Sequence, residues 1–185
     1  MPRIAERKFY DGAEERIARL GLTNLSKELD RILTGFELRV KEEKDSNGGA
    51  VIRALLDERF QEVGGWTKKQ TGDVDWVKCL VVNGTRVCLG VEIQFSGRGD
   101  MLIIDVAHLR EQINTGLIDV GVIVVATDRL GQFLTDRAAR YADAIRAVKR
   151  AQAEELPLLI VALEHDGPGE PLPKMRTRQG RLSSN

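Results

Sequence analysis

The spacing of apolar residues changes about one third of the way along the chain. In residues 1–63 apolar side chains recur every three or four positions, which predicts helices. These positions are Ile4, Ile17, Leu20, Leu25, Leu29, Ile32, Leu33, Phe36 and Val40, and then Ile52, Leu55, Leu56, Phe60 and Val63. A polar stretch, residues 41–49, precedes the last helix. Ser46 or Asn47 is expected to cap that helix, and Gly64-Gly65 to end it.

From residue 74 onward the sequence is typical of strands that alternate with helices. Residues 74–82 and 85–95 are rich in β-branched and apolar side chains, and Asn83-Gly84 between them strongly predicts a tight hairpin turn. The remaining chain predicts a helix over 100–114 closed by Gly116, a strand over 117–126 buried on both faces, a helix over 130–155 and a strand over 158–163. This order predicts an α/β fold in which helices flank a mixed sheet.

Composition limits the class of protein. The 185 residues are 42% hydrophobic and 30% charged, which excludes wholesale disorder. The longest apolar run, Val120 to Ala126, is too short for a membrane span, and no secretory signal is visible, so we expect a cytoplasmic protein without a membrane partner. The length fits a single domain over residues 1–173, with a helical N-terminal part, and a basic tail over 174–185.

The predicted hairpin brings two pairs of side chains together. If the turn holds only Asn83 and Gly84, counting back along both strands places Cys79 opposite Cys88 and Asp75 opposite Glu92. In a reducing cytosol we expect the two cysteines to remain free thiols. Acids that face each other across a ladder repel, so they persist where a cation or a shared proton offsets their charge.

Two carboxylates and the Ile93 carbonyl form a set of hard oxygen ligands, which suits Mg²⁺. Asp73 competes with Asp75 for the first position in this set, and Gly90 on the same face would leave room for a ligand. The alternative is a hairpin at the edge of the sheet whose acidic face simply meets water.

Asp75, the turn and Glu92-Ile93-Gln94 together resemble the PD-(D/E)XK nuclease core, in which an Asp begins one strand and (D/E)-x-K lies on the next. Here the third position is Gln94. From residue 72 to residue 126 the chain more closely resembles the BglII/BamHI-type type II restriction endonucleases. The resemblance lies in the variant motif E-x-Q, in the predicted helix 100–114 and in the apolar strand 117–126.

The resemblance implies a restriction-endonuclease-like fold and Mg²⁺-dependent, sequence-specific hydrolysis of double-stranded DNA. The substrate would be a palindromic site with a GATC core, and the enzyme a homodimer built on the helix 100–114 or 130–155. Asp75, Glu92 and the Ile93 carbonyl would hold Mg²⁺, and Gln94 would orient the attacking water. An amide is no general base near neutral pH, so the proton must leave to another group. Glu58, or alternatively Glu62, would supply the acid that this family places on the preceding helix.

Several polar residues are candidates for DNA contacts. Arg129 could pair with guanine, although Thr127 or Asp128 could instead cap a helix. The basic tail could bind phosphate. The full set of candidates is Ser96, Arg98, Asp128, Arg129, Lys174, Arg176 and Arg178.

Two other functions remain open from the sequence. One is a non-specific or structure-specific DNA repair nuclease of the same fold, and the other is a non-catalytic DNA-binding protein. His108 could act as a general base, but a histidine in the middle of a helix more often has a structural role.

Overall fold

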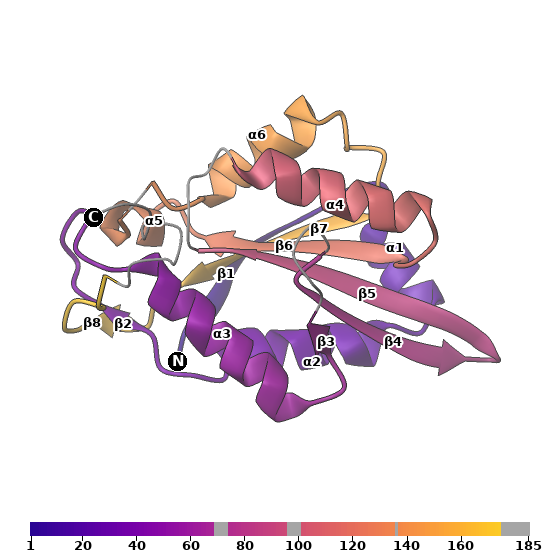
Figure 1. Cartoon of the computed structure of the whole chain (residues 1–185), viewed down its shortest axis with the longest axis horizontal. Helices are drawn as coiled ribbons and strands as arrows, with labels where there is room; N and C mark the ends of the chain where they lie inside the picture. The colour runs from indigo at the N-terminus through magenta and orange to yellow at the C-terminus, as the bar shows by residue number, and fades with distance from the viewer. Residues whose placement is uncertain (69–73, 96–100, 136, 175–185) are drawn as a thin grey trace, which may run out of the picture.

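The structure, a computed structural model, describes residues 1–68, 74–95, 101–135 and 137–174. Its main element is a six-stranded mixed sheet with helices on both faces (Figure 1). The sheet has the order β1-β7-β6-β5-β4-β3, with β5, β6 and β7 parallel. The strands are β1 (Arg3–Phe9), β3 (Thr67–Lys68), β4 (Trp76–Val82), β5 (Thr85–Gln94), β6 (Val120–Ala126) and β7 (Leu158–Glu164). A second, parallel pair joins β2 (Arg39–Val40) to β8 (Gly167–Pro168). The predicted fold class is confirmed.

The helices form a layer on each face of the sheet, so there are two apolar cores. One core contains side chains of α1 (Ala13–Arg19), α2 (Thr23–Thr34) and α3 (Gly49–Val63), and the other contains side chains of α4 (Leu102–Asn114) and α6 (Tyr141–Arg150). Figure 1 shows α4 and α6 above the sheet and α2 and α3 below it. Along β6, Val122 and Val124 face one core while Ile123 and Val125 face the other. The prediction of a strand buried on both faces is therefore confirmed.

The β4–β5 hairpin has the predicted register. Val82 pairs with Thr85, and Cys79 pairs with Cys88. Asn83 and Gly84 both have positive φ angles, 50° and 81°, as a two-residue turn that matches the twist of the strands requires. Cys79 and Cys88 form a disulfide, so the expectation of free thiols is wrong. Directly facing positions on one side of the hairpin bring the two sulfur atoms within bonding reach.

Two predicted helices are wrong. Residues 3–9 form the edge strand β1, antiparallel to β7, and are mostly exposed, so their sequence lacks the alternation of a half-buried strand. The helix expected over 130–155 is two helices, α5 (Leu130–Phe133) and α6. Leu134 is extended and forms a bridge with Asn47, while Arg140 forms a bridge with Ala126. These long-range backbone contacts interrupt the helix.

The predicted cap of α3 is also wrong, because the helix begins after Gly48 without a side-chain cap. Asn47 is fully buried instead, and its amide donates to the carbonyls of Lys41 and Phe133. Its side-chain oxygen accepts from the backbone N–H groups of Lys41 and Leu172. The predicted helix ends are confirmed. Gly64 follows the last residue of α3 directly, Gly116 lies two residues after the end of α4, and both glycines have positive φ angles. None of the described helices has both the length and the apolar character that a bilayer crossing needs.

Candidate functional site

The candidate site lies where the parallel strands end. In open α/β sheets, ligands bind beyond the carboxyl ends of parallel strands, because several loops meet there. β5, β6 and β7 end at Gln94, Ala126 and Glu164, toward the left of Figure 1, and the first turn of α3 lies at the same edge. That turn approaches β5 so closely that a Cβ atom on Gly49 would lie 1.8 Å from the Phe95 carbonyl oxygen.

Asp75 and Glu92 lie close enough together that the charge of Asp75 acts on the Glu92 carboxyl group. Asp75 directly precedes β4, and its Oδ2 accepts the Ile93 N–H at 2.8 Å. Glu92 is only 4% exposed. Burial, followed by the charges of Asp75 and Asp105, raises the pKa of Glu92 to about 10. A pKa near 10 keeps Glu92 protonated near neutral pH, which relieves the repulsion between the two acids.

Arg53 of α3 holds two of the oxygens that the sequence assigns to a metal ion. Its Nη2 donates to Asp75 Oδ1 at 2.6 Å, and its Nη1 donates to the Ile93 carbonyl at 2.7 Å. Its Nε donates to Asp57 Oδ1 at 3.2 Å. The sequence interpretation missed Arg53, although a basic residue on the helix that precedes the hairpin, four positions before an acid, was an available signal.

Asp57 is a structural partner of Arg53. It accepts hydrogen bonds from Trp76 Nε1 at 2.9 Å and from Lys68 Nζ at 2.7 Å. Burial acts to raise the pKa of Asp57, but the Lys68 hydrogen bond and the Arg53 charge outweigh it, so the pKa is lowered. Trp76 is buried and stacks on Phe60 at 5.1 Å, as expected of a core tryptophan.

The opposite side of the site is formed by α4. Asp105 and His108 are three residues apart on this helix and therefore share a face. His108 Nδ1 lies 3.2 Å from Glu92 Oε1. Asp105 Oδ2 is buried and has no hydrogen-bond partner within the described residues. Burial and the Asp75 charge raise the pKa of Asp105 to about 7.

This chemistry fits a divalent cation. Glu92, Asp105 and His108 each offer a ligand atom, and these atoms lie within 4.8 Å of one another. A buried carboxylate oxygen without a partner is costly, and a bound cation would satisfy it. Buried carboxylates held with raised pKa values beside each other are also typical of functional sites.

The other predicted catalytic residues differ in their placement. Gln94 ends β5 on the same side as Glu92, is half-buried, and its side-chain amide is not hydrogen-bonded to any described residue. Glu58 is exposed and has no ion pair or hydrogen bond with the described part of the site, while Glu62 pairs with Arg59. Gly90 does not make room for a ligand, because a Cβ atom there would lie 2.6 Å from Ile118 Cδ1.

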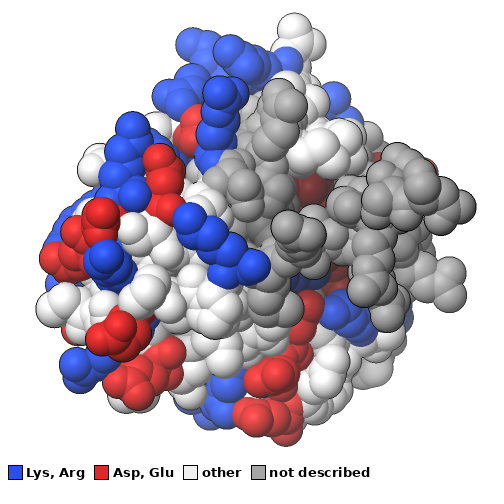
Figure 2. All heavy atoms as spheres, turned by 60° about the vertical axis from the view of Figure 1, so that its left-hand side comes forward, with Lys and Arg blue, Asp and Glu red and all other residues white. Residues whose placement is uncertain are grey.

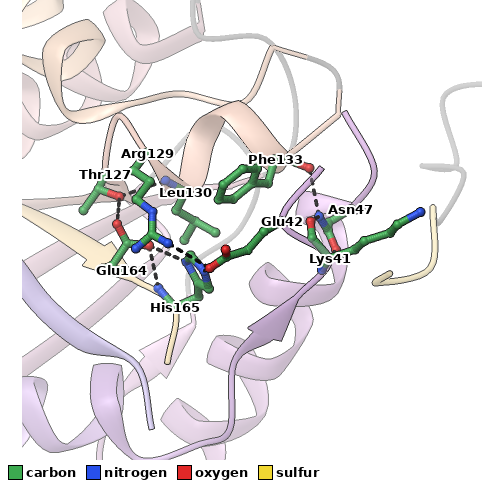
Figure 3. A network of polar contacts seen from close by, with 9 residues as sticks. All are labelled: Lys41, Glu42, Asn47, Thr127, Arg129, Leu130, Phe133, Glu164 and His165. Atoms are coloured by element: carbon green, nitrogen blue, oxygen red, sulfur yellow. Dashed lines mark hydrogen bonds and ion pairs between the residues drawn. The ribbon is translucent and has the colours of Figure 1, made fainter. Parts of the chain in front are cut away.

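The loop after β6 forms a separate polar network (Figure 3). Thr127 Oγ1 donates to Glu164 Oε2 at 2.8 Å and accepts the Leu130 N–H at 3.0 Å. Arg129 pairs with Glu42 at 2.8 Å, and Glu42 also contacts the buried His165. His165 in turn contacts Glu164, so the histidine lies between two carboxylates.

Asp128 lies in the same loop and accepts the Ala142 N–H at 3.1 Å. Thr127 and Asp128 thus bind backbone N–H groups in the first turns of α5 and α6. This agrees with the alternative that they cap helices.

Lys174 is exposed and also lies at this edge. It is beside the start of α3, because a Cβ atom on Gly48 would lie 3.0 Å from the Lys174 Cα. Figure 2 shows basic side chains gathered at the top of this end of the molecule, on the side where α6 lies. Asp73 and the predicted DNA contacts Ser96, Arg98, Arg176 and Arg178 lie outside the described residues.

A mixed α/β sheet with paired carboxylates near the end of a central strand defines the class of the restriction-endonuclease-like nucleases. The model of the family described as "Restriction endonuclease BglII/BglIII" matches residues 6–163. The chain belongs to this family, whose members are deoxyribonucleases, and the resemblance found in the sequence is confirmed at the level of the family. The chain has no significant match among curated proteins.

Proposed function

We propose that the protein is a type II restriction endonuclease that hydrolyses double-stranded DNA at a specific palindromic site and uses Mg²⁺. One observation carries the proposal. In a chain of the BglII/BglIII family, the Asp75 carboxylate accepts the Ile93 N–H at the end of β5 and lies near the buried Glu92, whose pKa its charge raises.

The residues that would hold Mg²⁺ are Asp75, Glu92 and the Ile93 carbonyl. A cation held by these groups would supply positive charge to the scissile phosphate and would make a water molecule a better nucleophile. Arg53 donates to Asp75 and to the Ile93 carbonyl and so keeps this oxygen set in place. When it releases them, its guanidinium becomes available for a phosphate oxygen.

Gln94 would orient the attacking water. Its amide lies on the Glu92 side of β5 and has both a donor and an acceptor. Because an amide does not take up a proton near neutral pH, the proton passes to a phosphate oxygen of the substrate or to solvent.

The DNA would lie across the edge at which β5, β6 and β7 end. Lys174 is exposed there, and we assign phosphate contacts to it, to Arg176 and Arg178 after it, and to Ser96 and Arg98 after β5. We assign base reading at a GATC-core site to Asp128 and Arg129. In the free protein Glu42 holds Arg129, so reading a base requires Arg129 to leave that ion pair.

A homodimer would present two such sites to the two strands of a palindrome. The exposed side of α4 and the turn after it carry large apolar residues that a second copy would cover. They are Met101, Ile103, Ile104 and Leu117, each 41–47% exposed. Since α4 also carries Asp105 and His108, the interface would lie directly behind the site. Its DNA substrate implies that the enzyme works in the cytoplasm.

Digestion of unmethylated phage DNA with Mg²⁺, followed by sequencing of the ends, tests this function. We expect discrete fragments whose ends share one palindromic sequence. Nicking that depends on DNA structure would instead indicate a repair nuclease, and DNA binding without cleavage would indicate a non-catalytic protein.

A further inference from the structure

We propose that Glu92, Asp105 and His108 form a second cation subsite, on the α4 side of Glu92, which binds a first-row transition ion such as Mn²⁺ more tightly than Mg²⁺. The inference rests on the proposed function, because the two subsites share Glu92. Compared with the Mg²⁺ site of the proposed function, the second subsite has two further ligands from α4 and prefers a different ion.

The ligand atoms of the three side chains lie near enough together to close around one ion. Their ligand atoms lie within 4.8 Å of one another, and His108 Nδ1 already lies 3.2 Å from Glu92 Oε1. Bonds of about 2.0–2.2 Å from an ion to nitrogen or oxygen place two ligands at most about 4.4 Å apart. The side chains must therefore close around the ion to complete the set.

No lysine or arginine of the described residues pairs with the carboxylates on the α4 side. Asp105 Oδ2 is buried without a hydrogen-bond partner, and within the described residues neither Asp105 nor Glu92 forms an ion pair with a lysine or arginine. The charge of Arg53 reaches Glu92 and Asp105 and acts to lower the pKa of both. Its three nitrogens, however, donate to Asp57, Asp75 and the Ile93 carbonyl. Asp105 Oδ2 thus receives no hydrogen bond from Arg53.

The donor atoms indicate which ion the subsite would select. Mg²⁺ prefers oxygen ligands and retains several waters, whereas imidazole nitrogen favours first-row transition ions. The Asp75 side offers only oxygen, while the α4 side offers two carboxylates and one imidazole. We therefore expect Mn²⁺ to occupy both subsites and Mg²⁺ to occupy mainly the Asp75 side.

Titration of the full-length protein with Mn²⁺, followed by electron paramagnetic resonance, measures occupancy, and spin-echo modulation detects nitrogen bound to the ion. The chain contains two histidines, and His165 is buried in a different network. In the wild type we expect two Mn²⁺ per chain and an imidazole nitrogen signal. We expect His108→Gln to lose that signal and Asp105→Asn to weaken the second Mn²⁺ at least tenfold. Glu111→Gln, at an exposed position of α4, should leave both unchanged.

Two outcomes overturn the subsite, namely a wild type without a nitrogen signal and a folded His108→Gln variant that retains it. If His108→Gln fails to fold, the Asp105→Asn variant tests the proposal instead. Unchanged Mn²⁺ occupancy of the second subsite in Asp105→Asn also contradicts the proposal. A protein that cuts DNA specifically but lacks the nitrogen signal refutes the subsite alone. One that shows the signal but cuts no DNA refutes the proposed function instead.

Discussion

At the scale of single residues, the site is controlled by the charge balance around Glu92. Its position opposite Asp75 could be predicted, because a two-residue turn and strand alternation fix which side chains meet. Arg53, Asp105 and His108 could not be placed in the same way. They reach the site only because α3 and α4 pack against opposite faces of the sheet. No local sequence pattern predicts the angle or the depth at which these helices pack.

The raised pKa of Glu92 predicts how stability depends on pH in metal-free protein. Between its ordinary pKa and its folded value near 10, the folded state binds more protons than the unfolded state, so the free energy of unfolding falls as pH rises. We expect Glu92→Gln to remove this loss and to be more stable than the wild type by several kcal/mol at pH 8 in EDTA. The difference should vanish near pH 4, where both states carry the proton.

Urea unfolding at pH 4 and pH 8 checks this expectation, with the exposed Glu58→Gln as the matched control. A Glu92→Gln variant with the same pH dependence as the wild type would show that Glu92 is ionised in the folded protein.

Arg53 compensates acidic charge in the site through its ion pairs with Asp57 and Asp75. Removing it in Arg53→Ala leaves Asp75 and the Ile93 carbonyl without their donor, which should cost about 2–3 kcal/mol in EDTA. Mg²⁺ should recover part of this loss, so the melting temperature of the variant should rise more with Mg²⁺ than that of the wild type. Arg59→Ala, which removes a surface pair with Glu62, is the control on the same helix. Equal Mg²⁺ shifts in Arg53→Ala and wild type would count against a cation position at these oxygens.

At the scale of elements, strongly periodic sequence predicted the central strands well. The edge strand of the sheet and the break between two helices did not follow from local sequence. The apolar run of β6 and the Asn83-Gly84 turn were sufficient for the central strand and the hairpin register. The strand β1 is mostly exposed, so burial left little pattern in its sequence. The interruption between α5 and α6 arises from bridges to Asn47 and Ala126, which are distant in the sequence.

The exposed apolar side of α4 predicts dimerisation through this helix. Placing a charge at its centre with Ile104→Glu should shift the protein from dimer to monomer and raise the dissociation constant at least tenfold, since a buried unpaired charge is costly. Sedimentation equilibrium measures the shift, and Val81→Glu, at an exposed apolar position of β4, controls for the added charge. A wild type that is monomeric at micromolar concentration, or an Ile104→Glu dimer of unchanged affinity, excludes α4 as the interface.

At the scale of the whole molecule, attraction to DNA must be local, because the 28 basic and 28 acidic residues cancel. The ends of three parallel strands bring together the acidic cluster, the Arg129–Glu42 pair and Lys174. The sequence indicated the family through a short stretch around the hairpin and β6, and the family model extends that similarity over residues 6–163.

The central claim is that Asp75 and Glu92 together hold the cation that DNA cleavage needs. Its most direct test is the single-turnover cleavage rate of a specific duplex in Mg²⁺, compared for wild type, Asp75→Asn, Glu92→Gln and the control Glu58→Gln, with duplex binding measured in parallel without Mg²⁺. We expect each site variant to bind the duplex but to cut it at least a thousandfold more slowly, about 4 kcal/mol in the barrier, while Glu58→Gln cuts at the wild-type rate. Wild-type cleavage by a folded Asp75→Asn or Glu92→Gln variant would contradict the account.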